Sequence, residues 1–234
     1  MANNFKNAVI RNVSADSTLP TVIYSVPDSK KSIAIELDVA NKGSAGVNVT
    51  VQIEDESQNE TKDQAGTVTA SNAHVISAVD TNASGATAGQ LTTTSNADHN
   101  LIVNDRVLFN FSSAPSFTNA SLPPSGDAAL SASRFYYVQS VTTSAPFKFT
   151  IAETKSAASA LTFDAAGGGL EFKKIHLADV VKDAPVPVGG TLKVISGQKL
   201  VLESAAASSN DKLYAYCTSA NDVDAIASVL EDVS

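Results

Sequence analysis

The stretch SIAIELDVANKGSAGVNVTVQI, residues 32–53, alternates apolar and polar side chains on both sides of a loop that contains two glycines. Alternation with a period of two is typical of a β-strand that buries one face. The apolar positions are Ile33, Ile35, Leu37 and Val39 in the first run and Val47, Val49, Val51 and Ile53 in the second. Two such strands around the loop Asn41–Gly46 predict a β-hairpin.

A second informative stretch is KDAPVPVGGTLKVISGQKLVLE, residues 182–203. Pro185 and Pro187 fix φ and remove two backbone donors, so they predict an extended segment that is not an inner strand. The pair Gly189 and Gly190 predicts a turn. The apolar runs 191–195 and 199–202 predict two strands, and Ser196-Gly197-Gln198 between them predicts a tight hairpin connection.

The remaining segments favour strands as well. Residues 170–181 and 213–218 have β-branched and aromatic character. The run VDAIASVL, residues 223–230, fits a helix or a strand by pattern alone, and we predict a strand because its neighbours are strands.

The polar run EDESQNETKDQAG, residues 54–66, predicts a solvated loop. A calcium site among Glu54, Asp55, Glu56, Glu60 and Asp63 is the alternative, but the run lacks the ligand spacing and central glycine of a calcium loop.

The composition changes twice along the chain and predicts an interrupted arrangement of domains. Residues 65–169 are rich in Ala, Ser, Thr and Asn, whereas the flanking parts carry the clearest alternating runs. We therefore predict an all-β protein. Residues 1–64 plus 170–234 form an outer β-sandwich module of jelly-roll-like character, and residues 65–169 form a second, small, sandwich-like β-module inserted into it.

Charge and residue usage exclude several classes of function. The net charge is −8 and the 16 basic residues are scattered, so nucleic acid is not expected as a partner. No segment approaches the ~20 apolar residues of a membrane span, and no membrane partner is expected. The one cysteine, Cys217, cannot form an intrachain disulfide, and its strand-like surroundings predict a buried thiol.

Catalytic motifs are not recognisable in the chain. His74, His99 and His176 lie far apart, and none has the spacing of a metal-ligand pair. There is no Gly-x-Ser-x-Gly elbow and no glycine-rich loop followed by Lys-Ser/Thr. We therefore predict a protein that is not an enzyme, with no catalytic residue, no metal and no cofactor. Asp105, after Asn104, predicts a side-chain-to-backbone turn bond.

The inserted module carries a series of short motifs in a specific order. They are His99-Asn-Leu101, Asn104-Asp-Arg-Val-Leu-Phe109, Leu122-Pro123, Leu130-Ser-Ala132, Arg134-Phe-Tyr-Tyr-Val138, Phe147-Lys-Phe-Thr-Ile-Ala152 and Ala160-Leu-Thr-Phe163. This series resembles a small β-module of bacteriophage tail and virion proteins. The family typically has glycine where this chain has Asn100 and Asn104. Because Asn tolerates the left-handed backbone region well, the turns can be kept.

The outer module resembles small structural proteins of marine and cyanobacterial phages. The resemblance rests on residues 30–41, 182–192, 199–203 and 228–231. It implies a virion component, assembled in the host cytoplasm, without enzyme activity. Its partners would be other virion proteins, either the major capsid protein or tail proteins. A homo-oligomer is expected, and the analogy with decoration proteins suggests a trimer.

Within this class we expect a capsid decoration or cement protein that binds the shell in many copies. A tail, collar or fibre-associated component is one alternative, and a host-surface binding module with exposed aromatic residues is another. A glycan hydrolase is disfavoured because it needs a carboxylate pair in an aromatic cleft.

Candidate contact residues lie in both modules. In the outer module they are Pro185, Pro187, Gly189 and Gly190. In the insert they are Phe117, Leu122, Pro123, Tyr136 and Tyr137. The long loop from Ser112 to Ala129 is expected to face outward. Tyr136 and Tyr137 are expected on opposite faces of one strand, so that one is core and the other is available to a partner.

Overall fold

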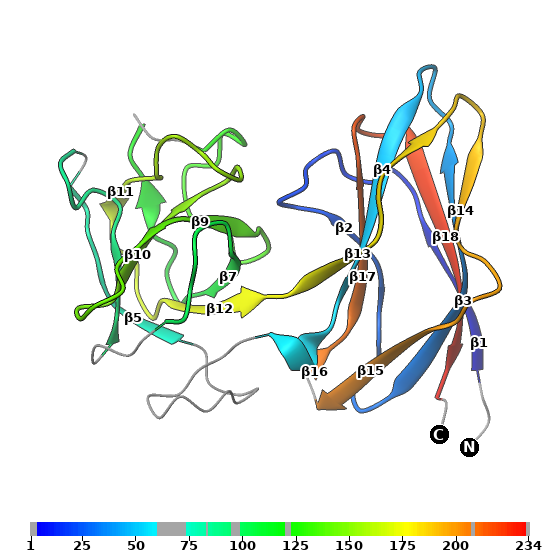
Figure 1. The fold of residues 1–234 in the computed structure, drawn as a ribbon, viewed down its shortest axis with the longest axis horizontal. Helices are drawn as coiled ribbons and strands as arrows, with labels where there is room; N and C mark the ends of the chain where they lie inside the picture. The colour runs from blue at the N-terminus through cyan, green and yellow to red at the C-terminus, as the bar shows by residue number, and fades with distance from the viewer. Residues whose placement is uncertain are drawn as a thin grey trace. The chain divides into compact units, whose positions relative to one another are not determined.

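The computed structural model consists almost entirely of antiparallel β-strands, which confirms the predicted all-β class (Figure 1). It describes residues 4–59, 74–82, 84–94, 99–119, 123–206 and 209–232. The chain divides into two compact units. Unit 1 is Met1–Gln58 with His176–Ser234, and unit 2 is Asn59–Ile175. The sequence-based boundaries, 64/65 and 169/170, fall a few residues inside unit 2 at both ends.

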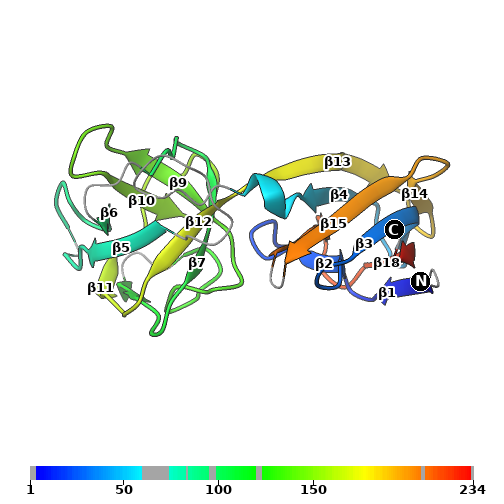
Figure 2. The ribbon, with the colours of Figure 1, turned by 90° about the horizontal axis from the view of Figure 1, so that it is seen from below.

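Unit 1 is a sandwich of two antiparallel sheets. Sheet A has the order β1 (Asn4–Ile10), β18 (Val223–Glu231), β3 (Lys31–Asn41), β15 (Leu200–Ala206) and β16 (Ser209–Asn210), with β14 (Thr191–Ile195) also paired to β3. Sheet B has the order β13 (Leu177–Val186), β4 (Val47–Glu54), β17 (Lys212–Cys217) and β2 (Thr21–Ser25). A short 3-10 turn, η1 (Glu56–Gln58), follows β4. Figure 2 shows β1 at the border of this sandwich.

Small aliphatic side chains from both sheets form the core of unit 1. The buried set from sheet A includes Ala34, Leu37, Val39, Leu202, Ala225, Ala227 and Val229. The set from sheet B includes Ile23, Val47, Val49, Val51, Leu213, Ala215 and Cys217. Small and β-branched residues fit here because side chains of two facing sheets interdigitate across about 10 Å. The buried thiol predicted for Cys217 is confirmed.

The hairpin predicted for residues 32–53 is wrong. Both strands exist, but β3 lies in sheet A and β4 in sheet B, so the loop crosses from one sheet to the other. The buried amide of Asn41 organises this crossing by donating to the carbonyls of Ala45 and Val186. The alternation identified two strands with a common core. It did not identify their pairing partners, because strands of either sheet bury the same kind of face.

A β-bulge changes which residues of β3 face the core. The register with β18 pairs Glu36 with Ser228 and Ala34 with Val229, so Ile35 is the extra residue. Ala34, Leu37 and Val39 are buried, whereas Ile33 and Ile35 are only partly buried. The predicted inward positions of Ile33 and Ile35 are therefore wrong, because an extra residue inverts the phase of a period-two pattern.

The stretch 182–203 combines a confirmed turn with an absent hairpin. Pro185 lies in β13, an edge strand of sheet B, as its missing donor requires. The turn Pro187–Gly190 closes through a 2.9 Å hydrogen bond, with Gly189 at φ 66°. β14 and β15 do not pair with each other, because both pair with β3 end to end along one edge. Residues 196–199 are thus an interruption in an edge rather than a hairpin turn.

Two further predicted segments differ in outcome. The run 223–230 is a strand, β18, as predicted. The predicted single strand 170–181 is two strands in two units, β12 (Glu171–Ile175) and β13. Only one residue, His176, separates them, which is too short a break to be visible in the apolar pattern.

Unit 2 is a closed barrel rather than the sandwich-like module that we expected. Its order is β10 (Lys148–Ala152), β6 (Leu91–Thr93), β5 (His74–Val79), β12, β7 (Arg106–Asn110) and β9 (Tyr136–Val141). A two-stranded sheet of β11 (Phe163–Ala165) and β8 (Ser116–Phe117) accompanies it. Aromatic rings dominate the core, including Phe109, Phe117, Tyr136, Phe149, Phe163 and Phe172.

Asn100 and Asn104 adopt the left-handed backbone conformation that we predicted for them. Asn100 has φ 50° and Asn104 has φ 74°, both in the left-handed region. The predicted turn bond of Asp105 is also present, because its Oδ2 accepts from the amide of Ile102 at 2.8 Å. Asp105 additionally pairs with Lys174 at 3.0 Å, where both side chains are largely buried.

Candidate interaction surface

The outer face of sheet A carries apolar side chains on strands whose inner face is already buried. In β18, Ala225, Ala227 and Val229 face the core, so Ile226 and Leu230 must point to the other side of the sheet. In β1, Ala8 and Ile10 pack on the core, which places Phe5 and Val9 on the outside. An antiparallel sheet that faces water on one side normally has polar residues there. The outer face of sheet A departs from this pattern.

Register aligns four of these side chains into one line across the sheet. Phe5 of β1 is opposite Leu230 of β18, Leu230 is opposite Ile33 of β3, and Ile33 is opposite Val201 of β15. We call Phe5, Leu230, Ile33 and Val201 the apolar row. Phe5 is 70% exposed and Val201 is 53% exposed, while the two central members are partly covered by their neighbours. The pairing register therefore converts residues far apart in sequence into a continuous apolar surface.

A second, shorter line lies beside the apolar row. Val9 is opposite Ile226, and these side chains are 57% and 47% exposed. Between the two lines stand Asn7 and Ser228, which are joined by a 3.1 Å hydrogen bond. Farther across the sheet the second line ends in polar residues, because Ile226 is opposite Asp38 and Asp38 is opposite Lys193. The apolar character is thus concentrated on β1 and β18.

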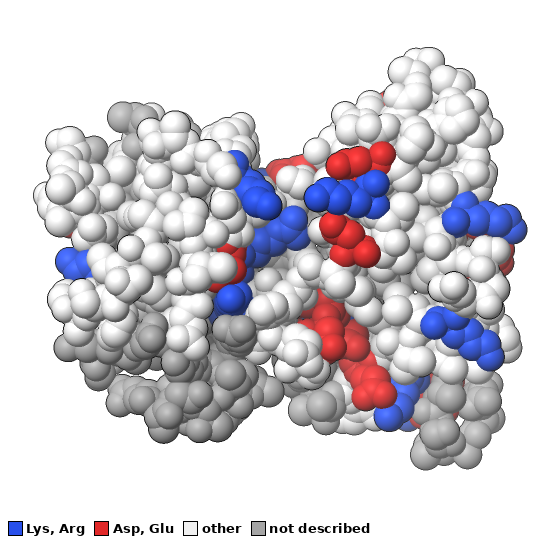
Figure 3. All heavy atoms as spheres, viewed as in Figure 1, with Lys and Arg blue, Asp and Glu red and all other residues white. Residues whose placement is uncertain are grey.

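Ion pairs border the apolar row and leave it without net charge. Lys31 pairs with Glu203 at 2.9 Å, and Lys193 pairs with Glu36 at 3.4 Å. All four side chains are strongly exposed, so each pair contributes little to stability. Figure 3 shows one side of unit 1, where most blue side chains lie beside red ones and one longer red patch is present; the surface around the apolar row carries the two balanced pairs just described. Such a surface suits a protein partner better than a strongly charged ligand.

The outer face of sheet B is polar and hydrogen-bonded within itself. Tyr214 donates to Glu54 at 2.6 Å, and the Glu54 carboxylate is also 3.3 Å from the ammonium of Lys212. Burial and the neighbouring Glu54 charge raise the pKa of the Tyr214 hydroxyl well above its usual value. At the sheet edge, Gln52 donates to Asp179 at 2.6 Å. These groups satisfy one another and present no apolar patch.

The predicted solvated loop after β4 is partly buried. Glu54 is the last residue of β4 and is 1% exposed, and Glu56 in η1 is 8% exposed. The amide of Glu56 donates to Asp211, whose pKa is raised by burial. Glu60 and Asp63 lie outside the described residues. Among the residues that the structure describes, no group of three or more His, Cys, Asp or Glu side chains is placed to hold a metal ion.

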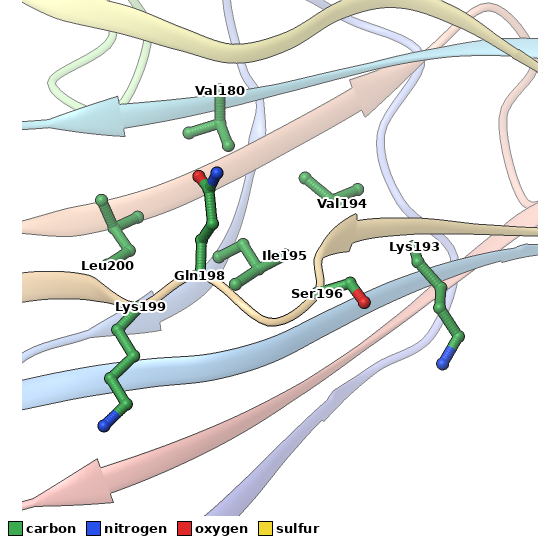
Figure 4. Close-up of a pocket in the computed structure, with 8 residues that line it drawn as sticks. All are labelled: Val180, Lys193, Val194, Ile195, Ser196, Gln198, Lys199 and Leu200. Atoms are coloured by element: carbon green, nitrogen blue, oxygen red, sulfur yellow. The ribbon is translucent and has the colours of Figure 1, made fainter.

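A cavity of about 380 Å³ opens where the edge of sheet A is interrupted between β14 and β15. Its lining combines Val180 of β13 with residues 193–196 and 198–200. In Figure 4 the side chain of Gln198 points toward Val180, whereas the ammonium groups of Lys193 and Lys199 point away from this space. The cavity is therefore lined by apolar side chains together with the Gln198 amide and the Ser196 hydroxyl, and the two ammonium groups do not converge on it.

The structure separates the predicted contact residues into two groups. Pro185, Pro187 and Gly189 are exposed and Gly190 partly so, on the border strand and turn of unit 1. Phe117, Pro123, Tyr136 and Tyr137 are buried inside unit 2, so as contact residues they are wrong. Leu122 lies outside the described residues.

The two tyrosines are buried for different reasons. Tyr136 packs on Phe109 and Phe117, while Tyr137 lies under the guanidinium of Arg106, 5.4 Å from the ring centroid. Strand alternation alone suggested that one ring would be exposed. In unit 2 that expectation fails, because a long neighbouring side chain covers the second face.

Part of the loop 112–129 is tied to the barrel instead of facing freely outward. The amide and hydroxyl of Ser125 donate to the carboxylate of Glu153 at 2.9 and 2.6 Å. Arg134, only 7% exposed at its side chain, pairs with Glu153 at 3.2 Å and with Asp127 at 3.1 Å. These charge-assisted bonds hold this section of the loop in one conformation.

The two histidines of unit 2 have structural surroundings. His74 stacks on Phe172 with ring centroids 4.9 Å apart. His99 accepts from the amide of Leu101 at 3.0 Å and meets the rings of Phe147 and Phe149 edge-on. Burial raises the pKa of the Cys217 thiol, which favours its unreactive protonated form. None of these groups is arranged as a nucleophile with a base.

Sequence reasoning missed the apolar row, although a signal was present. β18 has apolar residues at both phases of its alternation, with Ile226 and Leu230 out of phase with its Ala and Val positions. A strand that is apolar on both faces at the surface of a sandwich indicates a contact surface.

The scan against protein-family models and the search of curated proteins gave no match. Within the described part of the chain, no helix has the length and apolarity that a membrane crossing needs.

Proposed function

We propose that the chain is a non-enzymatic structural protein of a bacteriophage particle and, within that class, a capsid decoration or cement protein. The phage assignment is supported by the motif series of unit 2 and by the resemblance of the outer module. The observation that carries the structural role is the apolar row, a flat uncharged surface on the outside of a sandwich whose core is complete. A shell protein of the virion is the partner that we propose for it.

The energetics of the apolar row suit a partner that presents many identical sites. Fully burying one side chain such as Phe5 contributes about 2 kcal/mol, and the row has only two strongly exposed members. A single contact of this size is weak. Many copies on one lattice gain strength from repetition and from contacts among neighbours. A cement protein acts in this way, whereas an enzyme would need a converging polar site.

Cryo-electron microscopy of the intact particle tests the proposal directly. We expect density for the chain repeated over the shell, with the outer face of sheet A against the shell protein. Density restricted to a vertex, collar or tail would replace the decoration role by the tail-associated alternative. Density at the tips of fibres would favour the host-surface binding module, an alternative weakened by the burial of Tyr136 and Tyr137. Absence from the particle would overturn the virion assignment.

A matched pair of variants tests the role of the row. Val201→Asp introduces a charge into the apolar row at a side chain that is 53% exposed, so the fold should tolerate it. We expect it to reduce binding to shells depleted of the protein. Val75→Asp, at a 46% exposed position of unit 2, is the control and should bind normally. Equal binding by all three proteins would show that the row is not the contact.

A further inference from the structure

The edge strand β1 differs from every other edge of the sandwich. Edges of natural sheets are normally protected against pairing by charged side chains, lysine above all, and by proline, bulges, interruptions or very short strands. β13 carries Pro185 and two register irregularities, and β2 has five residues with one irregularity. The edge formed by β14 and β15 is interrupted at residues 196–199. Each of these three edges therefore has a recognisable protection.

β1 carries one of these features, the charged side chain of Lys6, and lacks the others. It has seven residues, lacks proline, and keeps an unbroken register with β18 from Asn4 to Ile10. Its only charged side chain, Lys6, is engaged by Glu231 at 2.9 Å. Within the described residues β18 is its sole strand partner, and its two outward apolar side chains are the most exposed of sheet A. A regular, apolar, unpaired edge is a template for another strand.

The sequence of β1 is complementary to itself. When two copies pair antiparallel about Asn7, all seven residues are matched, and Phe5 lies opposite Val9 of the second copy. Aromatic residues opposite β-branched residues stabilise antiparallel pairs. Lys6 then lies opposite Ala8, so the two lysines do not meet. Moving the axis to Ala8 would place Phe5 opposite Arg11 and Val9 opposite Asn7, which loses the apolar pairing.

We propose that β1 binds β1 of a second copy of this chain, in antiparallel register about Asn7, to form a two-fold dimer with a continuous sheet A. In this dimer the apolar row of one copy continues into Val9 and Ile226 of the other. The contact surface becomes twice as long without any change in the fold. The inference does not depend on the virion role, because it uses only the edge and its register.

Cysteine crosslinking tests the register. In Asn7→Cys the two cysteines face each other across the axis with Cα atoms about 5 Å apart, within reach of a disulfide. Ser228→Cys is the matched control. Residue 228 lies opposite Asn7 on the neighbouring strand, so its Cα would be about 14 Å from the Cα of residue 228 in the second copy. The native Cys217 is buried and should not interfere. We expect oxidation to give a covalent dimer of Asn7→Cys and not of Ser228→Cys.

Sedimentation velocity over a concentration series tests the association itself. The paired strands bury less than a standard interface of ~1,600 Å², so we expect a dissociation constant in the micromolar range. Val9→Lys places a lysine beside Phe5 twice per dimer and should weaken association at least about tenfold. Val201→Lys, equally exposed but distant from the edge, should leave the dimer unchanged.

Three results would overturn the proposal. The first is a monomer at every concentration up to about 1 mM. The second is crosslinking of Ser228→Cys as fast as that of Asn7→Cys. The third is equal loss of association in Val9→Lys and Val201→Lys, which would mean that the copies meet through the apolar row instead of the edge. Failure of shell binding with an intact dimer would reject the virion role alone.

Discussion

The two units of this chain fill their interiors in opposite ways. Eight of the nine phenylalanines lie in unit 2, and the remaining one, Phe5, is on the surface of unit 1. The sandwich uses valine, alanine and leucine between two sheets whose longest strands have 8 to 11 residues. The barrel has strands of three to six residues, and large rings occupy the space that so few short strands enclose. Core composition therefore follows the geometry of the space to be filled.

The difference also decides where apolar residues are left over. The sandwich has a complete core and still carries the apolar row on its outer face. The barrel keeps its rings inside and exposes apolar residues mainly at one turn, where Ile102 and Val103 are 65% and 48% exposed. A surface patch on regular strands is a flat contact area, whereas a turn presents a small projection. The candidate interaction surface therefore lies on unit 1.

The largest expected loss of stability comes from truncating a large buried side chain, and it should affect only the unit that contains that side chain. Phe149 is 1% exposed and packs on Phe172 with ring centroids 4.8 Å apart. We expect Phe149→Ala to destabilise unit 2 by about 3–5 kcal/mol, because it leaves a cavity among rigid rings. Leu37→Ala is the counterpart in unit 1 and should cost about 2–5 kcal/mol there.

Hydrogen exchange followed by mass spectrometry measures both effects in one molecule. In Phe149→Ala, peptides from β9 and β10 should lose protection while those from β18 keep it, and Leu37→Ala should give the reverse. Loss of protection in both units from either variant would show that the cores do not unfold separately.

The next effect is alkaline destabilisation. Burial raises the pKa of Tyr136 in unit 2 to about 12, and burial likewise raises the pKa of Tyr24 and Tyr214 in unit 1. Each hydroxyl ionises more readily in the unfolded chain, where its pKa is about 10. Its stabilising contribution is therefore complete below pH 10 and is lost as pH rises through the folded pKa.

The slope of this loss distinguishes the two units. Each group lowers the free energy of unfolding by up to about 1.4 kcal/mol per pH unit above pH 10. Unit 1 has two such hydroxyls and also the thiol of Cys217, whose pKa burial raises as well, so it should lose stability about two to three times as steeply as unit 2. Urea unfolding between pH 9 and 11, followed separately by peptides of each unit, checks this, and tyrosine absorbance reports the ionisation. Equal slopes would contradict the assignment.

Removing single hydroxyl groups should have a smaller effect. Tyr214 donates to a carboxylate that is 1% exposed, whereas the Tyr136 hydroxyl accepts from the amide of Ser131 at 3.0 Å. Tyr214→Phe removes a donor from a buried charge and should cost about 2–3 kcal/mol. Tyr136→Phe leaves a partly buried amide and should cost about 1 kcal/mol. Denaturant titrations of both variants measure the difference, and a larger loss for Tyr136→Phe would contradict it.

Local features of the fold were predictable from the sequence because their causes are local. The period-two runs predicted strands, Pro185 predicted an edge position, and Gly189 and Asn104 predicted turns, which the structure shows with positive φ. Each follows from the geometry of one residue or one strand. The strand choice for β18 also held, although its own pattern was ambiguous.

Pairing and surface properties were not predictable in the same way. The alternation of residues 32–53 is identical for a hairpin and for two strands in facing sheets. The bulge at Ile35 inverted the phase of β3, and only the register with β18 reveals it. The apolar row joins positions as distant as Phe5 and Leu230, which no pattern along the chain connects. Burial of Tyr137 likewise depends on Arg106, a residue of another strand.

The smallest losses of stability are expected from substitutions in one turn of each unit. Gly189 has φ 66°, and a Cβ added to it would meet no atom within 4 Å, so Gly189→Ala should cost only the left-handed backbone preference, about 1 kcal/mol. Asn104 has φ 74° and accepts from the amide of Ser156 at 2.9 Å. Asn104→Ala loses this bond and the tolerance of Asn for the left-handed region, so it should cost about 1–2 kcal/mol.

Asn104→Gly separates the two causes, because glycine restores the backbone freedom and still lacks the acceptor. Thermal unfolding should place Asn104→Gly between the wild type and Asn104→Ala. If Asn104→Gly equals Asn104→Ala, the side-chain bond alone holds the barrel turn. If it equals the wild type, the two turns rest on the same backbone preference, and the asparagine acts as a substitute for glycine.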